Sequence, residues 1–139
     1  MRIVVDAVGT DNRPSPDVEG AVLAAREWKQ PIILVGPEAL IKQELAKHNT
    51  QNLPIEVVNA NDIIEMTDKP ADAVRDKQQS SMHIGLNLVK DGSADAFVTM
   101  GNTGAAHAIA MLSTLKRIQG VKRPALSIIY PIYGKPVIV

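Results

Sequence analysis

The sequence has no cysteine, few aromatic residues and no excess of either charge, and each absence excludes a class of protein. Without cysteine there is no disulfide, no thiolate nucleophile and no cysteine-ligated metal. Aromatic residues make up 3% of the chain, which argues against a platform that stacks nucleic-acid bases. Lysine plus arginine and aspartate plus glutamate both number 15, so no net positive charge attracts nucleic acid or an anionic membrane. No apolar run is long enough to cross a bilayer.

Short β-branched runs alternate in this sequence with apolar residues at helical spacing. The strand-like runs are residues 3–5, 32–35, 55–58 and 96–100, and the helical patterns cover residues 18–28, 38–47, 70–77, 82–89 and 105–118. This alternation is typical of βαβ units. It predicts one α/β domain over residues 1–139, with a mostly parallel sheet in a three-layer α/β/α arrangement. The strand that ends near Met100 is expected inside that sheet.

The last residues depart from this alternation. Residues 125–130 and 136–139 are strand-like, and the turn between them at residues 133–136 is too short for a parallel crossover. A final strand without its helix also leaves one face of a sheet uncovered. The sequence therefore predicts the N-terminal portion of a larger domain, in a chain that continues beyond residue 139.

A glycine-bounded loop, Gly101-Asn102-Thr103-Gly104, separates the strand-like run at residues 96–100 from an alanine-rich helical pattern. The first N–H groups of a helix have no partners inside it, and the helix dipole places partial positive charge there. Two glycines allow a ligand to approach the backbone, while Asn102 and Thr103 can cap the helix or donate hydrogen bonds. The loop is thus either an anion site or an ordinary turn into a helix.

Seven further polar residues are candidates for the same site: Asp6, Asp11, Lys69, Arg75, Ser80, Ser81 and His107. The two acids follow the first strand, where they can orient a cation, cap a helix or shape a turn. The two basic residues can neutralise an anion or lie solvated, and the serine pair can bind phosphate or begin a helix. The histidine can act as a general base or simply pack within its helix. The three histidines have no metal-ligand spacing.

Several segments, in this order, resemble one family: residues 6–11, residues 68–70 with Arg75, residues 80–82, residues 94–97 with residues 101–105, and residues 123–126. Together they are similar to the phosphate acyltransferases of bacterial phospholipid synthesis, the PlsX family, over essentially the whole chain. The resemblance implies a fold akin to isopropylmalate dehydrogenases and phosphotransacetylases. It also implies an enzyme that transfers a fatty acyl group from acyl-carrier protein to inorganic phosphate.

The resemblance further implies a cytoplasmic homodimer that needs no cofactor and no metal. Phosphate or acyl phosphate is expected at residues 101–104, flanked by Asp6, Lys69, Ser80 and Ser81. The family's chain is more than twice as long, and its second half supplies much of the cleft and the helices linked to dimerisation and peripheral membrane association. Residues 1–139 alone are therefore expected to be inactive.

The sequence departs from the family's usual pattern at three positions and in one segment. Val8 and Thr10 stand where the first motif usually has methionine and glycine, Met100 stands where alanine is usual, and residues 76–79 are less basic than usual. These changes bear on rate and partner affinity more than on fold. Two other readings of the chain remain open here: a non-catalytic remnant that binds acyl phosphate or carrier protein, and a phosphotransacylase that prefers short acyl chains.

Overall fold

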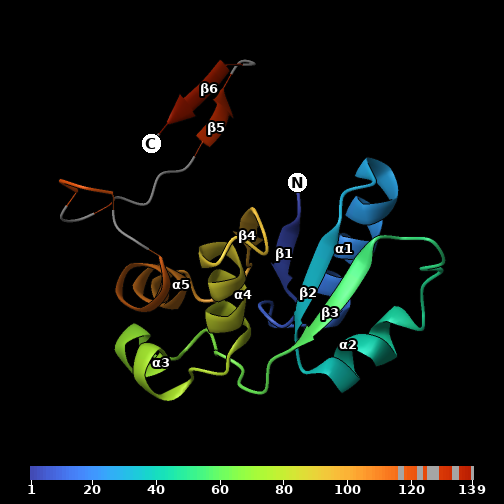
Figure 1. Ribbon diagram of the computed structural model, residues 1–139, viewed down its shortest axis with the longest axis horizontal. Coiled ribbons are helices and arrows are strands. Elements are labelled where there is room, and N and C mark those ends of the chain that lie inside the picture. Colours follow the sequence, from blue (N-terminus) through green and yellow to red (C-terminus); the bar gives the residue numbers. More distant parts are fainter. Residues whose placement is uncertain (116–117, 122–123, 125–128, 133–134, 139) are drawn as a thin grey trace.

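Four parallel strands form the centre of this protein, and helices lie on both faces of their sheet (Figure 1). In this computed structural model, the described residues are 1–115, 118–121, 124, 129–132 and 135–138. The strands are β1 (Ile3–Asp6), β2 (Ile32–Gly36), β3 (Ile55–Asn59) and β4 (Ala96–Val98), in the order β3-β2-β1-β4. The predicted α/β class with a parallel sheet is confirmed.

The helices divide between the two sheet faces because alternate strand residues point to opposite sides. Helices α1 (Ser15–Trp28) and α2 (Glu38–Leu45) cover one face, where Val18 and Ile41 pack against Leu34. Helix α4 (Ser81–Lys90) covers the other, where it packs against Val4 and neighbouring strand residues. This gives the three layers that the sequence predicts.

A separate apolar cluster joins α4 to α3 (Pro70–Asp76) and α5 (Thr103–Ile109). Met82 and Leu86 face this cluster, while Ile84 and Leu88 face the sheet, so α4 is apolar on two sides as its sequence predicts. Helices α3 and α5 lie side by side beyond α4 in Figure 1. The buried contacts of α4 therefore fix the start of α5 relative to the sheet.

In the sheet that the described residues form, strand β4 lies at an edge, whereas the sequence predicts an interior strand. It is three residues long, and among the described residues it pairs only with β1, through the register Val5 to Val98. On the sheet face that α1 covers, no helix from the described part of the chain lies over β4. Trp28, predicted on the buried face of α1, consequently borders a hollow of about 370 Å³ with Val98 and is 62% exposed.

The helix after Gly104 also ends earlier than its periodicity predicts. Helix α5 passes at Ala110 into a π-helical turn, η1 (Ala110–Thr114), and backbone bonding ends when the N–H of Leu115 donates to the carbonyl of Ala110. A π turn widens the spacing to five residues and so rotates later side chains away from the α-helical face. Leu112, predicted on that face, is accordingly 68% exposed.

The chain ends with two antiparallel strands, β5 (Ile129–Ile132) and β6 (Lys135–Ile138), which confirms that the last strands leave the parallel pattern. The predicted strand residues 125–128 and the centre of the predicted turn lie outside the described residues. No helix in the described part of the chain has both the length and the apolar character that crossing a bilayer requires.

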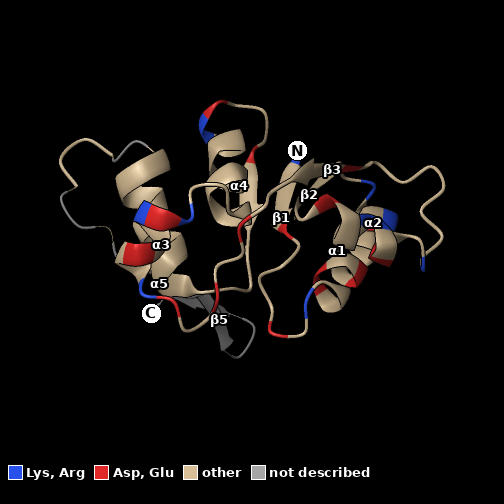
Figure 2. Cartoon of the chain, turned by 90° about the horizontal axis from the view of Figure 1, so that it is seen from below, with Lys and Arg blue, Asp and Glu red and all other residues tan. Residues whose placement is uncertain are grey.

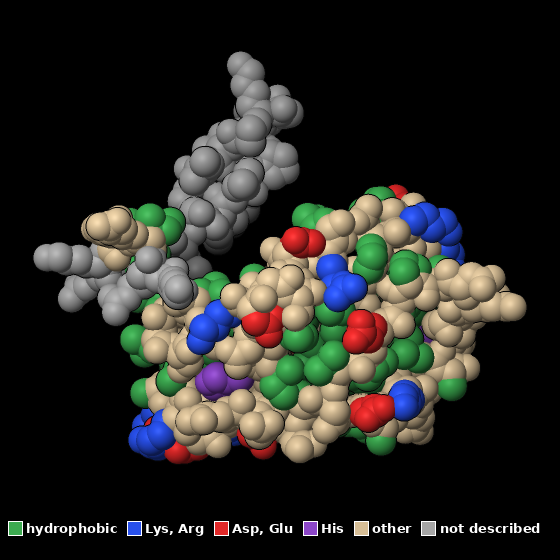
Figure 3. Space-filling model, viewed as in Figure 1, with side chains coloured by type: hydrophobic (Ala, Val, Ile, Leu, Met, Phe, Trp, Pro, Cys, Tyr) green, Lys and Arg blue, Asp and Glu red, His purple; other side chains and the backbone are tan. Residues whose placement is uncertain are grey.

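Charges of both signs are interspersed over the surface of the described residues. Figure 2 shows Lys and Arg alternating with Asp and Glu along the helices and loops, with no large region of one sign. In the view of Figure 3, hydrophobic side chains are visible at the middle of the face between single charged groups. The equal numbers of positive and negative residues in the sequence are thus also evenly mixed over the surface of this part of the chain.

Candidate anion site at the β1–β4 edge

The loops that follow β1 and β4 meet because the two strands are parallel neighbours and end at the same edge of the sheet. The chain places β2 and then β3 on one side of β1, and β4 on the other. The direction of winding therefore changes between β1 and β4. In open α/β sheets, ligands bind outside the carboxyl ends of the strands at such a point.

Asp6 and Thr99 link these two loops. The Thr99 hydroxyl donates to Asp6 Oδ2 at 2.7 Å and accepts from the Gly101 N–H at 3.0 Å. Asp6 Oδ1 accepts from the Val8 N–H at 3.2 Å, and the residue is only 2% exposed. Asp6 therefore lies beside the loop that follows β4, with its carboxylate occupied by groups that shape both loops.

Gly9 and Gly101 bring the two loops into backbone contact. A Cβ on Gly9 would lie 3.0 Å from the Gly101 nitrogen and 3.0 Å from Asp6 Oδ2. A Cβ on Gly101 would lie 3.2 Å from the Gly9 carbonyl oxygen and 2.8 Å from Met82 Cε. Any side chain at these positions would separate the loops, so glycine is required here for close approach.

The start of α5 leaves three backbone donors open within the described residues. The Gly101 N–H is bonded to Thr99, and the Ala105 N–H donates to the capping Asn102 side chain. Within the described residues the N–H groups of Asn102, Thr103 and Gly104 have no hydrogen-bond acceptor. Thr103 and Gly104 are exposed and Asn102 is half-buried, so the N–H groups of Thr103 and Gly104 are the most accessible to an anion.

Gly104 has a packing role that the sequence does not reveal. A Cβ on Gly104 would lie 2.8 Å from Pro70 Cγ at the start of α3. Valine at Gly104 would push α3 away from α5, so a substitution there would disturb packing as well as ligand binding. A test of ligand binding needs another position in the loop, and Thr103 offers one because its side chain is exposed.

The loop of residues 65–69 lies against the start of α5. The Asn102 side-chain amide donates to the backbone carbonyls of Glu65, Met66 and Asp68. Lys69 follows directly, occupies the N-cap position of α3 and is exposed. The backbone next to Lys69 is therefore held at the glycine-bounded loop, whereas the Asn102 side chain is bonded within the protein.

Ser80 and Ser81 lie at the start of α4, where both are buried. The Ser80 oxygen accepts from the His83 N–H, and it lies 3.0 Å from His83 Nδ1. Burial lowers the pKa of His83. The serine pair thus begins a helix, one of the two roles considered for it, and the neighbouring Met82 packs against Gly101.

Two of the remaining candidates lie apart from the loop contact. Arg75 is exposed and pairs with Asp76 and Asp72, which together raise its pKa far above the usual value. Asp11 is exposed in the turn after β1. Arg75 is therefore bound by its own helix neighbours, and Asp11 shares none of the contacts that join the two loops.

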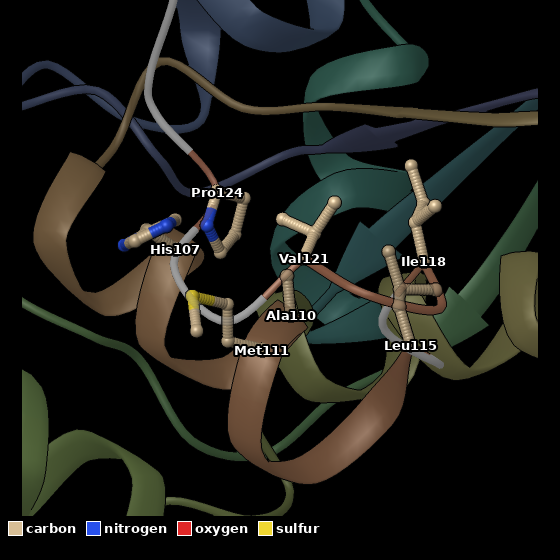
Figure 4. Close-up of a pocket in the computed structure, with 7 residues that line it drawn as sticks. All are labelled: His107, Ala110, Met111, Leu115, Ile118, Val121 and Pro124. Atoms are coloured by element: carbon tan, nitrogen blue, oxygen red, sulfur yellow. The ribbon is translucent and has the colours of Figure 1, made fainter.

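His107 lies one turn into α5 and borders an apolar cavity of about 260 Å³. Figure 4 shows it with Ala110, Met111 and Leu115, whose side chains also line that cavity. Its Nε2 atom is buried, and no partner for it occurs among the described residues. This position suits a packed histidine better than one that faces the open donors.

Sequence reasoning did not single out Thr99, Arg13 or Glu65 for this site. Arg13 contacts both carboxylate oxygens of Glu65, at 2.7 and 2.9 Å, and so joins the β1 loop to the 65–69 loop. The strand register could have indicated Thr99, because pairing of Val5 with Val98 places Asp6 opposite it. The Arg13–Glu65 pair has no comparable signal, since its partners lie 52 residues apart.

Comparison with known proteins places this sequence in a family. The sequence profile described as "Fatty acid synthesis protein" matches residues 1–139. The phosphate acyltransferase of Herpetosiphon aurantiacus is 55% identical over 94% of this chain and 35% of its own length. Those of Geobacter sulfurreducens and Koribacter versatilis are each 49% identical over 94% of this chain, and over 38% and 36% of their own lengths.

The chain thus spans little more than a third of the length of these relatives. The family match nevertheless extends from the first residue to the last. The resemblance drawn from short motifs agrees with it. On this evidence the chain belongs to the fatty acid synthesis protein family.

Proposed function

We propose that this chain is the N-terminal part of a longer phosphate acyltransferase, and that it binds phosphate at the β1–β4 edge. The full enzyme would transfer a fatty acyl group from acyl-carrier protein to inorganic phosphate and so supply acyl phosphate for phospholipid synthesis. The observation that carries this proposal is the identity of about half of all residues with proteins named phosphate acyltransferase. The open donors of Thr103 and Gly104 support it.

The proposed reaction asks for little covalent help from the protein. Phosphate is already an anion at neutral pH and attacks the thioester carbonyl carbon, forming a C–O bond. The tetrahedral intermediate then collapses, the C–S bond breaks, and the carrier-protein thiolate takes a proton from solvent. Catalysis by this route consists of holding phosphate beside the carbonyl and stabilising negative charge.

The residues of this chain have distinct parts in that scheme. The N–H groups of Thr103 and Gly104 bind phosphate oxygens, and the Lys69 ammonium adds a compensating charge. Asp6 does not touch the ligand but fixes Thr99, which in turn holds the Gly101 N–H. The β1 and β4 loops are thereby set before phosphate arrives, which reduces the ordering that binding requires.

The wider assembly is part of the same proposal. We infer a cytoplasmic homodimer whose remaining residues complete the cleft, receive acyl-carrier protein and make any peripheral membrane contact. The uncovered hollow between α1 and β4 supports the view that further protein surface packs on this domain, because parallel sheets are usually covered on both faces. Residues 1–139 alone are then expected to lack acyl transfer activity.

The direct test is to incubate the purified full-length protein with acyl-carrier protein bearing a long acyl chain, with and without inorganic phosphate. Phosphate-dependent release of free carrier-protein thiol, together with an acyl phosphate product, is the expected result. A folded protein that binds phosphate but releases no thiol would identify a non-catalytic module. Preference for acetyl or butyryl donors would identify a short-chain enzyme, and either result contradicts the proposal.

The site is tested by Thr103→Glu. An acidic residue in the first turn of a helix is favourable for the helix, so the fold should survive. The new carboxylate should repel phosphate and raise the KM for phosphate by about tenfold or more, as expected for loss of a charge-assisted contact. Gln51→Glu, which adds the same charge to an exposed turn before β3, is the matched control and should leave KM unchanged. Equal KM values for both variants would show that the phosphate site lies elsewhere in the protein.

A further inference from the structure

We propose that Asn102 is a positioning residue: it anchors the loop of residues 65–69 to the start of α5 and so holds Lys69 beside the open donors. This inference rests on the proposed phosphate site and gives Asn102 a role other than ligand contact. It predicts that Asn102 affects phosphate binding through Lys69, so that substitutions of the two residues have non-additive effects on the KM for phosphate.

The Asn102 side chain is engaged at both of its polar atoms. Its Nδ2 lies 3.1 Å from the Glu65 carbonyl oxygen, 3.2 Å from that of Met66 and 2.9 Å from that of Asp68. Its Oδ1 accepts from the Ala105 N–H at 3.0 Å, and this bond determines which end of the amide faces the loop. One amide therefore caps α5 and also collects three carbonyls from a segment more than 30 residues earlier in the chain.

Other contacts support the same loop from different directions. Arg13 holds the Glu65 carboxylate, and Lys77 forms an ion pair with Asp68, whose pKa is lowered by that hydrogen bond. The Asp68 carboxylate also accepts from the Glu65 N–H at 2.8 Å. These contacts shape the loop, but Asn102 is the residue that ties its backbone to the glycine-bounded segment.

Lys69 is the next residue after this anchored stretch. It caps α3, and the following Pro70 packs where a side chain on Gly104 would otherwise lie. Within the described residues, Lys69 has no carboxylate partner, unlike Arg13, Arg75 and Lys77. The anchored loop thus presents a cation beside α5, and that cation is available for an anionic ligand.

Two substitutions of Asn102 remove its contacts with the 65–69 loop while keeping an oxygen that can cap α5. Asn102→Asp keeps an oxygen that can cap α5 but replaces the amide donor with a carboxylate that repels three carbonyl oxygens. Asn102→Ser also retains a capping oxygen and loses the reach to the loop. Asn49→Asp is the matched control, because Asn49 Oδ1 accepts from the Gln51 N–H and this acceptor survives the change.

The experiment is a double-mutant cycle in the full-length protein, with inorganic phosphate as the varied substrate. Lys69→Met and Asn102→Asp should each raise the KM for phosphate about tenfold, while kcat at saturating phosphate changes less than twofold. The combined variant should be no more than about twofold worse than Asn102→Asp, because a released Lys69 no longer contributes. Asn49→Asp should match the parent. Additive effects of the two changes, or a fall in kcat at constant KM, would overturn the proposal.

Hydrogen exchange tests the anchor independently of activity. Asn102→Asp, or Asn102→Ser if the aspartate variant folds poorly, should speed exchange at the amides of Met66, Thr67 and Lys69 and leave the β1–β3 amides unchanged. Unchanged exchange in the loop would show that Asn102 is not its anchor. If the parent protein proves inactive while loop exchange rises as expected, the proposed acyl transfer fails and the anchoring role stands.

Discussion

The polar contacts at the β1–β4 edge and those at the end of α3 differ in their surroundings. The buried Asp6 and the half-buried Thr99 form a hydrogen bond between two loops that are distant in sequence. Arg75 pairs with Asp72 and Asp76 on its own exposed helix end. A buried polar group loses water as well as its partner when a contact is removed, whereas an exposed group regains water. The comparison predicts large effects at the β1–β4 edge and small ones at α3.

The largest loss of stability is expected from Gly9→Val, which forces apart the two loops. The added side chain meets Asp6 Oδ2 and the Gly101 nitrogen, so the free energy of unfolding should fall by about 3 kcal/mol. Urea denaturation of the full-length protein measures this. Ala46→Val is the control, because Ala46 is exposed at the end of α2, far from the loop contact. Similar losses for both variants would mean that loop contact is unimportant.

A smaller loss should follow from Thr99→Val, which keeps the shape but removes the hydroxyl. Asp6 then lacks a donor and the Gly101 N–H lacks an acceptor, which should cost about 2 kcal/mol in free energy of unfolding. The KM for phosphate should rise as the two loops loosen. Thr67→Val, at an exposed position, should cost little. If Thr99→Val left the free energy of unfolding unchanged, the Asp6–Thr99 hydrogen bond could not account for larger effects at the β1–β4 edge.

The buried Asp17 extends the comparison of buried and exposed groups to the pH dependence of stability. Burial raises its pKa above the ordinary value of 3.8, although the Thr10 hydroxyl donates to it at 2.7 Å. A raised folded pKa means that the associated stability is present below the unfolded pKa and is lost as pH rises through the folded value. Asp17→Asn should abolish that decline in the free energy of unfolding. Glu19→Gln, exposed on the same helix, should retain it, and identical pH profiles for the parent and Asp17→Asn would contradict the expectation.

The smallest effect is expected from Arg75→Gln at the exposed end of α3. Losing its pairs with Asp72 and Asp76 should leave thermal unfolding and the KM for phosphate indistinguishable from those of the parent, because exposed ion pairs contribute little. A raised KM would return Arg75 to the phosphate site, where the sequence motif had placed it as a secondary candidate.

The β1–β4 edge also separates what sequence patterns indicate from what they miss. Gly101, Asn102 and Lys69 were recognised from residue types and motif order, and the Asn102 amide bonds the carbonyl of Asp68, the residue before Lys69. The Gly101 N–H, by contrast, is not an open donor, because it already donates to the Thr99 hydroxyl. No pattern within the loop reports that a hydroxyl two residues earlier occupies its first donor.

The local sequence by itself determined the order of strands and helices, because β-branched runs, helical spacing and turn residues act over a few neighbouring positions. It also indicated the antiparallel end through a connection too short for a crossover. Tertiary structure decided that β4 is an edge strand in the described sheet, that Trp28 is exposed and that Asn102 bonds the 65–69 loop. Each of these outcomes depends on which distant segments become neighbours, and that depends on packing rather than on local propensity.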